Sequence, residues 1–288
     1  MKAFEFLLAR VVLATLSGTP LWLARRLARF YVLLLDLAIP RLRRTALKNL
    51  EMAGFAGRER IASGVFQSIA RLALTFARFP HINRDNLSDW IRYEGLENFE
   101  SAKARGKGVL VATGHFGNWE FSAFAHAFLC EPMHVVVRPI DNGKIDDLVE
   151  HRRALSGNFI IRKKEAARSI LRALGAGDAV GILIDQNTTP SEGVFIDFFG
   201  RKATAGTAFV KFAHHTGAAV VPGYALWSEK EGRYVLHFER EVELTGDVAA
   251  DTQRVHARLE AAIRRYPDQW LWIHRRWKTQ PPGDAPVY

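Results

Sequence analysis

The chain has 288 residues, a single cysteine and a formal net charge of +10 at pH 7. This length allows one substantial core and does not require a second globular domain. The lone Cys130 excludes an intrachain disulfide and a metal site built from several thiolates.

The first 50 residues concentrate the basic charge. They carry nine lysines and arginines against two acidic residues, a local net charge of +7. The basic side chains alternate with apolar runs such as 30–35, which is typical of helices lying on an anionic membrane surface. Nucleic acid is the rival partner, but the interleaved residues are aliphatic and no nucleic-acid motif appears, so we expect none. We predict membrane-associating basic amphipathic helices over 1–50 and a single α/β domain over 51–288.

A helix that crosses a bilayer needs roughly 20 mostly apolar residues. The longest uncharged stretch, Val11 to Ala24, is shorter and contains Pro20. Peripheral attachment and a single marginal span therefore both stay open. Glu5 and Arg10 interrupt any secretory signal, so we expect the catalytic part on the cytoplasmic face of a membrane.

Two helical segments follow from local signals. Thr19 and Pro20 are suited to cap and begin a helix, whose apolar periodicity continues to about Ala38 before Pro40 interrupts it. Residues 58–79 repeat apolar side chains at helical spacing, which predicts a helix that packs against a core. Two or three helices should therefore fill the beginning of the chain.

From about residue 90, short apolar runs alternate with helical segments. This alternation predicts an α/β fold, a central mixed sheet flanked by helices. Sites in open α/β sheets collect at the carboxyl ends of strands, and both His115 and Asp185 follow such runs. The expected strands are Gly108–Thr113, Met133–Val137, Ala179–Ile184, Ala218–Ala225 and Tyr234–Phe238.

The strand ending at Thr113 leads directly to His115, with Glu120 five positions later. Five residues turn about 140° past a full turn on a helix and fall on opposite faces of a strand, so neither element lets the two side chains meet. They meet if His115 lies on the loop, Gly117 and Asn118 bend the chain, and Glu120 lies in the first turn of a helix. A neutral imidazole oriented by a carboxylate suits general-base catalysis on a hydroxyl.

This pair has three other interpretations. Glu120 also suits the helix start through the helix dipole alone. A metal-dependent hydrolase would draw ligands from His115, Glu120, Asp185 and His214 or His215, but no His-Glu-x-x-His helix is present and we predict no metal. A serine hydrolase lacks its Gly-x-Ser-x-Gly turn.

Further segments carry chemistry of lower specificity. Residues 194–201 are aromatic and aliphatic with one terminal cation, which suits either ordinary core or the wall of an acyl channel. Residues 270–278 mix tryptophans with cations, which suits interfacial anchoring or a helix whose tryptophans pack inward. Arg138 and, further on, Arg152 and Arg153 carry guanidinium groups that suit either bidentate phosphate binding or an ordinary solvated surface. The candidate substrate-binding residues are Arg138, Asn142, Arg153, Asp185, Gln186, Arg201, Arg275 and Arg276.

In this order the motifs resemble the bacterial lipid A biosynthesis acyltransferases, the lauroyl and myristoyl transferases related to glycerolipid acyltransferases. The resemblance spans roughly residues 90–280. It rests on His115-x-x-x-x-Glu120, Arg138-Pro139-x-Asp141-Asn142, Arg152-Arg153, Asp185-Gln186, Phe198-Phe199-Gly200, Ala203-Thr204-Ala205-Gly206 and Trp272-Ile273-His274-Arg275-Arg276-Trp277-Lys278.

The resemblance implies an acyltransferase without a cofactor. His115 would take the proton of a hydroxyl on a lipid A precursor, an anionic glycolipid, and that oxygen would attack the thioester of an acyl carrier protein, with Glu120 orienting His115. It further implies that Arg153 binds phosphate or the thioester oxygen and that Asp185 supports the site. Arg275 and Arg276 would bind the lipid head group or the carrier protein at the cytoplasmic face of the bacterial inner membrane. Acyl-coenzyme A as donor, and another glycolipid or an aminolipid as acceptor, remain alternatives.

Overall fold

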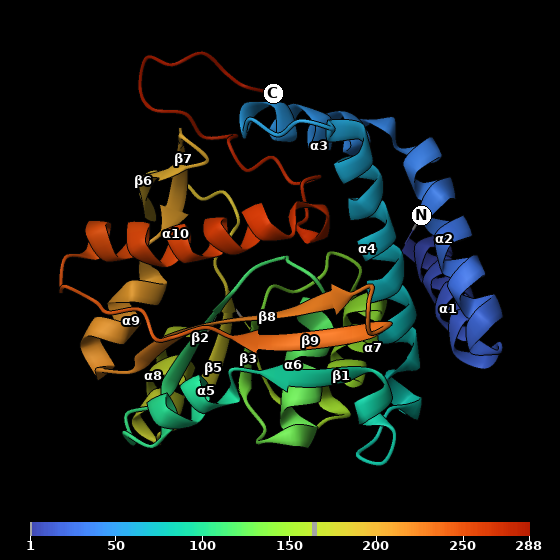
Figure 1. Cartoon of the computed structure of the whole chain (residues 1–288), viewed down its shortest axis with the longest axis horizontal. Coiled ribbons are helices and arrows are strands. Elements are labelled where there is room, and N and C mark those ends of the chain that lie inside the picture. Colours follow the sequence, from blue (N-terminus) through green and yellow to red (C-terminus); the bar gives the residue numbers. More distant parts are fainter. Residues whose placement is uncertain (1, 163–165) are drawn as a thin grey trace.

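The computed structural model describes residues 2–162 and 166–288. The chain begins with four helices, α1 (Lys2–Gly18), α2 (Leu21–Ala38), α3 (Pro40–Met52) and α4 (Arg58–Arg78). The helices expected from Pro20 and from 58–79 are confirmed, and Pro20 and Pro40 mark the breaks. Helices α1 and α2 pack against α4 through small and aliphatic side chains, among them Leu16 and Ala24. These two helices form one side of the molecule (Figure 1).

The uncharged stretch Val11 to Ala24 is divided between α1 and α2. Among the described residues, no helix combines the length and the apolar composition needed to cross a membrane.

A seven-stranded mixed sheet forms the centre of the fold, as expected. Its strand order is β1-β9-β8-β2-β5-β3-β4, and every neighbouring pair is parallel except β8 and β9. All five expected strands are present. Strands β1 and β4 were not predicted from the sequence. The strands are β1 (Ile91–Glu94), β2 (Val109–Thr113), β3 (His134–Val137), β4 (Phe159–Arg162), β5 (Ala179–Leu183), β8 (Ala219–Ser228) and β9 (Arg233–Phe238).

Helices cover both faces of this sheet. The side chains of β2 alternate between the two layers: Val109 and Val111 face α5 and α6, while Leu110 and Ala112 face α8, α9 and α10. A strand buried on both faces reads as a continuous apolar run, and this explains why β2 is conspicuous in the sequence. The flanking helices are α5 (Leu96–Lys103), α6 (Trp119–Leu129), α7 (Gly143–Ala154), α8 (Ala166–Gly175), α9 (Ala208–Thr216) and α10 (Val248–Arg265).

Residues 194–201 belong to a separate hairpin of β6 (Gly193–Phe198) and β7 (Arg201–Gly206). Its two-residue turn, Phe199 and Gly200, has positive φ at both positions, the geometry of a tight hairpin turn. Phe199 is held there because its N–H donates to Glu260 Oε2 at 2.7 Å. Phe198 and Phe199 pack into an aromatic core with the C-terminal tryptophans. In the described structure this segment is therefore core, the simpler of its two interpretations.

Candidate active site

His115 lies on the loop that connects β2 to α6. Gly117 has a φ of +62°, and a Cβ at this position would lie 2.0 Å from the carbonyl oxygen of Ala225, so only glycine fits the turn. Asn118 then caps α6, since its Oδ1 accepts from the N–H of Phe121 at 3.0 Å. The loop and helix start expected from the sequence are confirmed.

Asp185 follows β5, which pairs in parallel with β2 in the register Thr113 to Leu183. The two strands therefore deliver His115 and Asp185 to the same point, two residues beyond the paired ends. The backbone N–H of His115 donates to Asp185 Oδ2 at 2.7 Å, and His115 Nδ1 lies 2.9 Å from Asp185 Oδ1. Asp185 thus holds both the backbone and the ring of His115.

The C-terminal segment completes the environment of Asp185. Trp270 donates its indole Nε1–H to Asp185 Oδ2 at 2.9 Å, and the N–H of Leu271 donates to the carbonyl oxygen of His115 at 2.9 Å. Trp270 also forms an isolated β-bridge with Phe116. Sequence reasoning noticed this tryptophan only as part of an unusual aromatic and cationic segment and did not assign it to the site.

The charges of the pair reinforce each other. Burial raises the pKa of Asp185, but the charge and hydrogen bond of His115 and the Trp270 hydrogen bond outweigh it and hold that pKa well below its usual value. Burial lowers the pKa of His115, but the carboxylates of Asp185 and Glu120 outweigh it and raise that pKa above its usual value. An ionised Asp185 can only accept, so neutral His115 carries its proton on Nδ1 and leaves Nε2 as a lone-pair base.

The Nε2 side of the ring faces the rest of the site. The side-chain amide nitrogen of Gln186 lies 3.4 Å from His115 Nε2, and the Trp119 ring packs edge-on against the imidazole with centroids 5.0 Å apart. Gln186 is exposed and His115 is largely buried. The candidate substrate-binding residue Gln186 therefore lies beside His115, and the Trp119 ring packs against the imidazole.

The structure differs from the expectation in the partner of His115. The carboxylate of Glu120 is engaged by Arg153, whose Nε and Nη2 donate to its two oxygens at 2.8 and 2.6 Å. Glu120 lies in the first turn of α6 and Arg153 in the last turn of α7, so the guanidinium fork of one helix reaches the carboxylate of the other. The hydrogen bond that orients His115 comes from Asp185, and Glu120 acts on the imidazole through its charge.

In the described part of the chain, four other candidate residues form no hydrogen bond or ion pair with His115 or Asp185. Arg138 and Arg275 are exposed, and the guanidinium of Arg275 lies over the Tyr288 ring. Arg201 is exposed on the β6–β7 hairpin and donates Nε–H to the carbonyl oxygen of Met52. Asn142 is buried and its amide donates to the carbonyl oxygen of Lys2 and to Glu5, tying α7 to α1. Its amide nitrogen is thus engaged within the fold.

Arg276, which the resemblance assigns to the lipid head group or the carrier protein, lies inside the core. Arg276 is 0% exposed, its Nη1 donates to the carbonyl oxygen of Thr204 at 2.5 Å, and burial lowers its pKa to about 10. The tryptophans around it are also buried, and the segment contains no helix, so neither interfacial anchoring nor an inward-facing helix describes it. Trp270, Trp272 and Trp277 instead seal the core beneath the β6–β7 hairpin.

Of the residues considered as metal ligands, His115 and Asp185 are in contact, whereas His214 has a different partner. His214 on α9 pairs with Asp251 on α10 at 2.8 Å, far along the chain from the His115 loop. Within 2–162 and 166–288, no group of three or more His, Cys, Asp or Glu side chains is arranged to hold a metal ion.

Comparisons with known proteins agree on one family. The family described as bacterial lipid A biosynthesis acyltransferase matches residues 2–279. A lipid A biosynthesis palmitoleoyltransferase of Escherichia coli (strain K12) is 28% identical over 250 residues, 84% of this chain and 81% of that protein. A lipid A biosynthesis lauroyltransferase of the same organism is 28% identical over 200 residues, which are 68% of this chain and 65% of that protein.

The name of a further relative gives a different lipid. A phosphatidylinositol mannoside acyltransferase of Mycolicibacterium smegmatis (strain ATCC 700084 / mc(2)155) is 25% identical over 214 residues, 73% of this chain and 70% of that protein. The family match covers nearly the whole chain and includes the His115 loop, Asp185 and the Trp270 segment. The chain therefore belongs to the bacterial lipid A biosynthesis acyltransferase family, and it is an acyltransferase.

Proposed function

We propose that the protein transfers a fatty acyl chain from an acyl carrier protein thioester to a hydroxyl of a lipid A precursor, with His115 as the general base. The observation that carries this proposal is the Nδ1 contact of His115 with Asp185, which leaves Nε2 directed away as a base. The family match and the names of the relatives support the acceptor class.

The reaction needs no covalent enzyme intermediate. His115 Nε2 accepts the hydroxyl proton while the acceptor oxygen attacks the thioester carbonyl carbon and forms the new C–O bond. The tetrahedral intermediate collapses with cleavage of the C–S bond, and protonated His115 returns the proton to the leaving sulfur. Asp185 stabilises the imidazolium formed on the way, as the carboxylate of a triad does.

The Glu120–Arg153 pair supplies charge beside the base. Glu120 raises the pKa of His115, which favours acceptance of the proton. We assign Arg153, whose side chain is 20% exposed, to the thioester oxygen or to a phosphate of the acceptor, held in place by its bidentate contact with Glu120. Glu120 therefore acts through its charge and through its contact with Arg153, whereas the orienting role expected for Glu120 is assigned to Asp185.

The same proposal places the enzyme on the cytoplasmic face of the bacterial inner membrane, attached peripherally through α1 and α2. The support is the net charge of +7 over residues 1–50 together with large apolar side chains exposed on both helices. Carrier proteins with acidic helices are attracted to basic surfaces, to which the exposed Arg138, Arg201 and Arg275 contribute.

The test is mass spectrometry of lipid products after incubation of the purified protein with acyl carrier protein thioesters and a tetra-acylated lipid A precursor. We expect one added acyl group with the wild type and none with His115→Ala, which should retain its fold and its membrane binding. Equal transfer by His115→Ala would remove the proposed base. Transfer that is lost with a chelator and restored by a metal would favour the metal-dependent alternative.

A second candidate is acyl transfer to another glycolipid with acyl-coenzyme A as donor. The observation that favours it is the similarity to phosphatidylinositol mannoside acyltransferases. The same assay with acyl-coenzyme A and a mannosylated phosphatidylinositol discriminates the two: product only in this second reaction would replace the lipid A acceptor while keeping His115 as base.

A further inference from the structure

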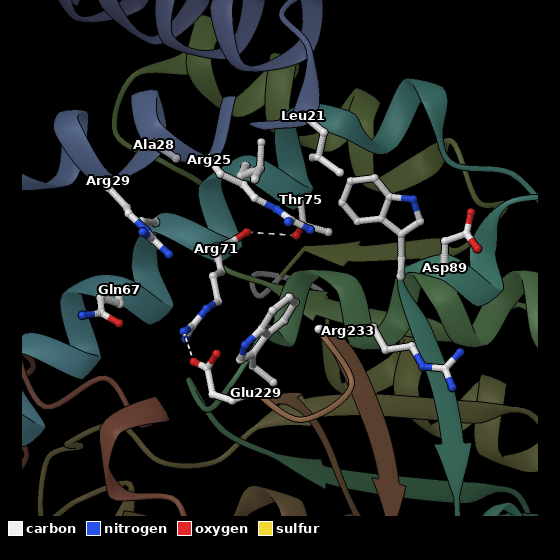
Figure 2. A pocket seen from close by; sticks show the side chains of 15 residues that line it. Leu21, Arg25, Ala28, Arg29, Gln67, Arg71, Thr75, Asp89, Glu229 and Arg233 are labelled. Carbon is white, nitrogen blue, oxygen red and sulfur yellow. Dashed lines mark hydrogen bonds and ion pairs between the residues drawn. The ribbon is translucent and has the colours of Figure 1, made fainter. Parts of the chain in front are cut away.

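A cavity of about 410 Å³ lies between α2, α4 and the turn that joins β8 to β9 (Figure 2). Its size is within the range of about 300–1,000 Å³ that is usual for small-molecule sites. His115, Glu120, Arg153 and Asp185 are not among its lining residues. The cavity is thus a feature separate from the catalytic residues.

Four arginines line the cavity, and two of them are already engaged. Arg71 forms an ion pair with Glu229 and stacks over the Trp227 ring, with the guanidinium carbon 5.0 Å from the ring centroid. Arg233 donates to the carbonyl oxygen of Ser88 at 2.7 Å and pairs with Glu231 at 3.1 Å. Arg71 and Arg233 therefore already have carboxylate partners within the protein.

Arg25 and Arg29 line the cavity from α2, and their contacts differ from those of Arg71 and Arg233. They are one turn apart on α2 and both extend toward the cavity (Figure 2). In the parts of the chain that the structure describes, neither forms an ion pair, and both are exposed. Two like charges at this spacing repel each other, so an anion between them would be stabilised by both guanidinium groups.

The rest of the lining combines polar side chains, Gln67, Thr75, Asp89 and Glu229, with an apolar part. Leu21 and Ala28 from α2, Leu74 from α4 and the rings of Trp90 and Trp227 separate the charged groups. A ligand that fills the cavity therefore needs an anionic group and an apolar part. A small inorganic anion would leave the apolar lining uncovered.

The source of such a ligand is indicated by the neighbouring surface. Leu21 belongs both to the cavity and to a row of exposed apolar side chains along α2, in which Trp22 is 60% and Leu37 67% exposed. On α1, Phe4 is 69% exposed. Helices with apolar side chains beside arginines are suited to the interface of an anionic membrane, where phosphate head groups meet acyl chains.

We propose that this cavity binds the head group of one anionic phospholipid, with its phosphate between Arg25 and Arg29 and its glycerol and first acyl carbons against Leu21 and Leu74. This inference rests on the proposed membrane-surface association and not on the acyl-transfer chemistry. The site would retain the enzyme on the membrane through a specific contact in addition to general electrostatic attraction.

The first test measures binding of dihexanoyl phosphatidylglycerol below its critical micelle concentration, by titration of tryptophan fluorescence, because Trp90 and Trp227 line the cavity. We expect saturable binding with one site per chain, at least tenfold tighter than binding of dihexanoyl phosphatidylcholine or of inorganic phosphate. Arg25→Gln/Arg29→Gln should weaken it at least tenfold. Arg168→Gln/Arg172→Gln, an equal change of charge one turn apart on α8, should leave it unchanged; α8 is well separated from α2 in Figure 1.

A charge-retaining variant separates a specific site from diffuse attraction. Arg25→Lys/Arg29→Lys keeps the net charge but loses bidentate contact with phosphate, so we expect weaker binding of the monomeric lipid. Equal affinity of this variant and the wild type, or equal effects of the α2 and α8 variants, would overturn the proposal. Equal affinity for inorganic phosphate and phosphatidylglycerol would overturn the lipid source. Each result is independent of the His115→Ala transfer assay, so this inference and the proposed function can fail separately.

Discussion

His115 Nδ1 and Asp185 Oδ1 lie 2.9 Å apart although 70 positions separate the two residues in the chain. The contact exists because β2 and β5 are parallel neighbours in register, each followed by a loop at its carboxyl end. Asp185 therefore takes the orienting position that the sequence suggested for Glu120, while Glu120 and Arg153 form a second pair beside it.

Asp185→Asn should reduce kcat/KM by roughly 10²–10⁴-fold, because the amide no longer fixes the Nδ1–H tautomer or stabilises the imidazolium. The pH profile gives an independent measure. The base acts only when His115 is neutral, and the raised pKa of His115 places the acid limb of wild-type activity above the usual pKa of about 6.5. In Asp185→Asn the Asp185 charge no longer offsets the effect of burial on the pKa of His115. That pKa should fall, and the acid limb of activity should move to lower pH.

The matched control for this change is Asp178→Asn. Asp178 also faces a histidine, with Asp178 Oδ2 3.1 Å from His134 Nε2, but away from the His115 loop. Activity and pH profile should stay as in the wild type. An acid limb at the same pH in Asp185→Asn and the wild type would contradict the assigned pairing.

Trp270→Phe should lower kcat about tenfold or more with KM nearly unchanged, because the lost indole N–H is one of the two donors to Oδ2 of the buried Asp185 carboxylate and leaves only the backbone N–H of His115 there. A hydrogen bond to a charged group contributes about 1.5–3 kcal/mol, which corresponds to this range. Trp272→Phe is the comparison, since Trp272 is equally buried but donates to the carbonyl oxygen of Pro267. Equal losses of kcat in the two variants would mean that Trp270 contributes through packing and not through its hydrogen bond to Asp185.

Glu120 and Arg153 should behave as one unit in a double-mutant cycle. Glu120→Gln and Arg153→Gln each leave a partly buried charge without its partner, so their effects on kcat/KM should not add, with a coupling of about 1.5–3 kcal/mol. The control cycle uses Glu150 and Arg162, whose side chains are 34% and 53% exposed, and should give less than about 1 kcal/mol in unfolding experiments. Additive effects at Glu120 and Arg153 would argue for independent roles.

Gly117→Ala should destabilise the protein by about 3 kcal/mol or more, because the new Cβ would lie 2.0 Å from the carbonyl oxygen of Ala225 and the backbone is left-handed. Gly54→Ala tests the backbone effect alone, since Gly54 also has positive φ but open space around its Cβ position. It should cost about 1 kcal/mol. Urea unfolding followed by circular dichroism measures both, and equal losses would mean that the loop relaxes around the added methyl.

Local patterns predicted much of the fold. Proline positions and apolar periodicity identified α2 and α4, and the buried run 109–113 identified the strand before His115. The hairpin β6–β7 and the short strands β1 and β4 were missed, because strands of four to six residues with mixed burial carry little periodic signal.

The sequence by itself determined the candidate base His115, the loop on which it lies and the helix that carries Glu120, since all three follow from adjacent residues. Only the tertiary structure decided that Asp185 orients His115, that Trp270 donates to Asp185 and that Arg276 is buried. The physical reason is that periodicity records which face of an element is apolar, whereas the order of strands in a sheet depends on pairings between distant segments. The partner of a catalytic side chain is set by that order.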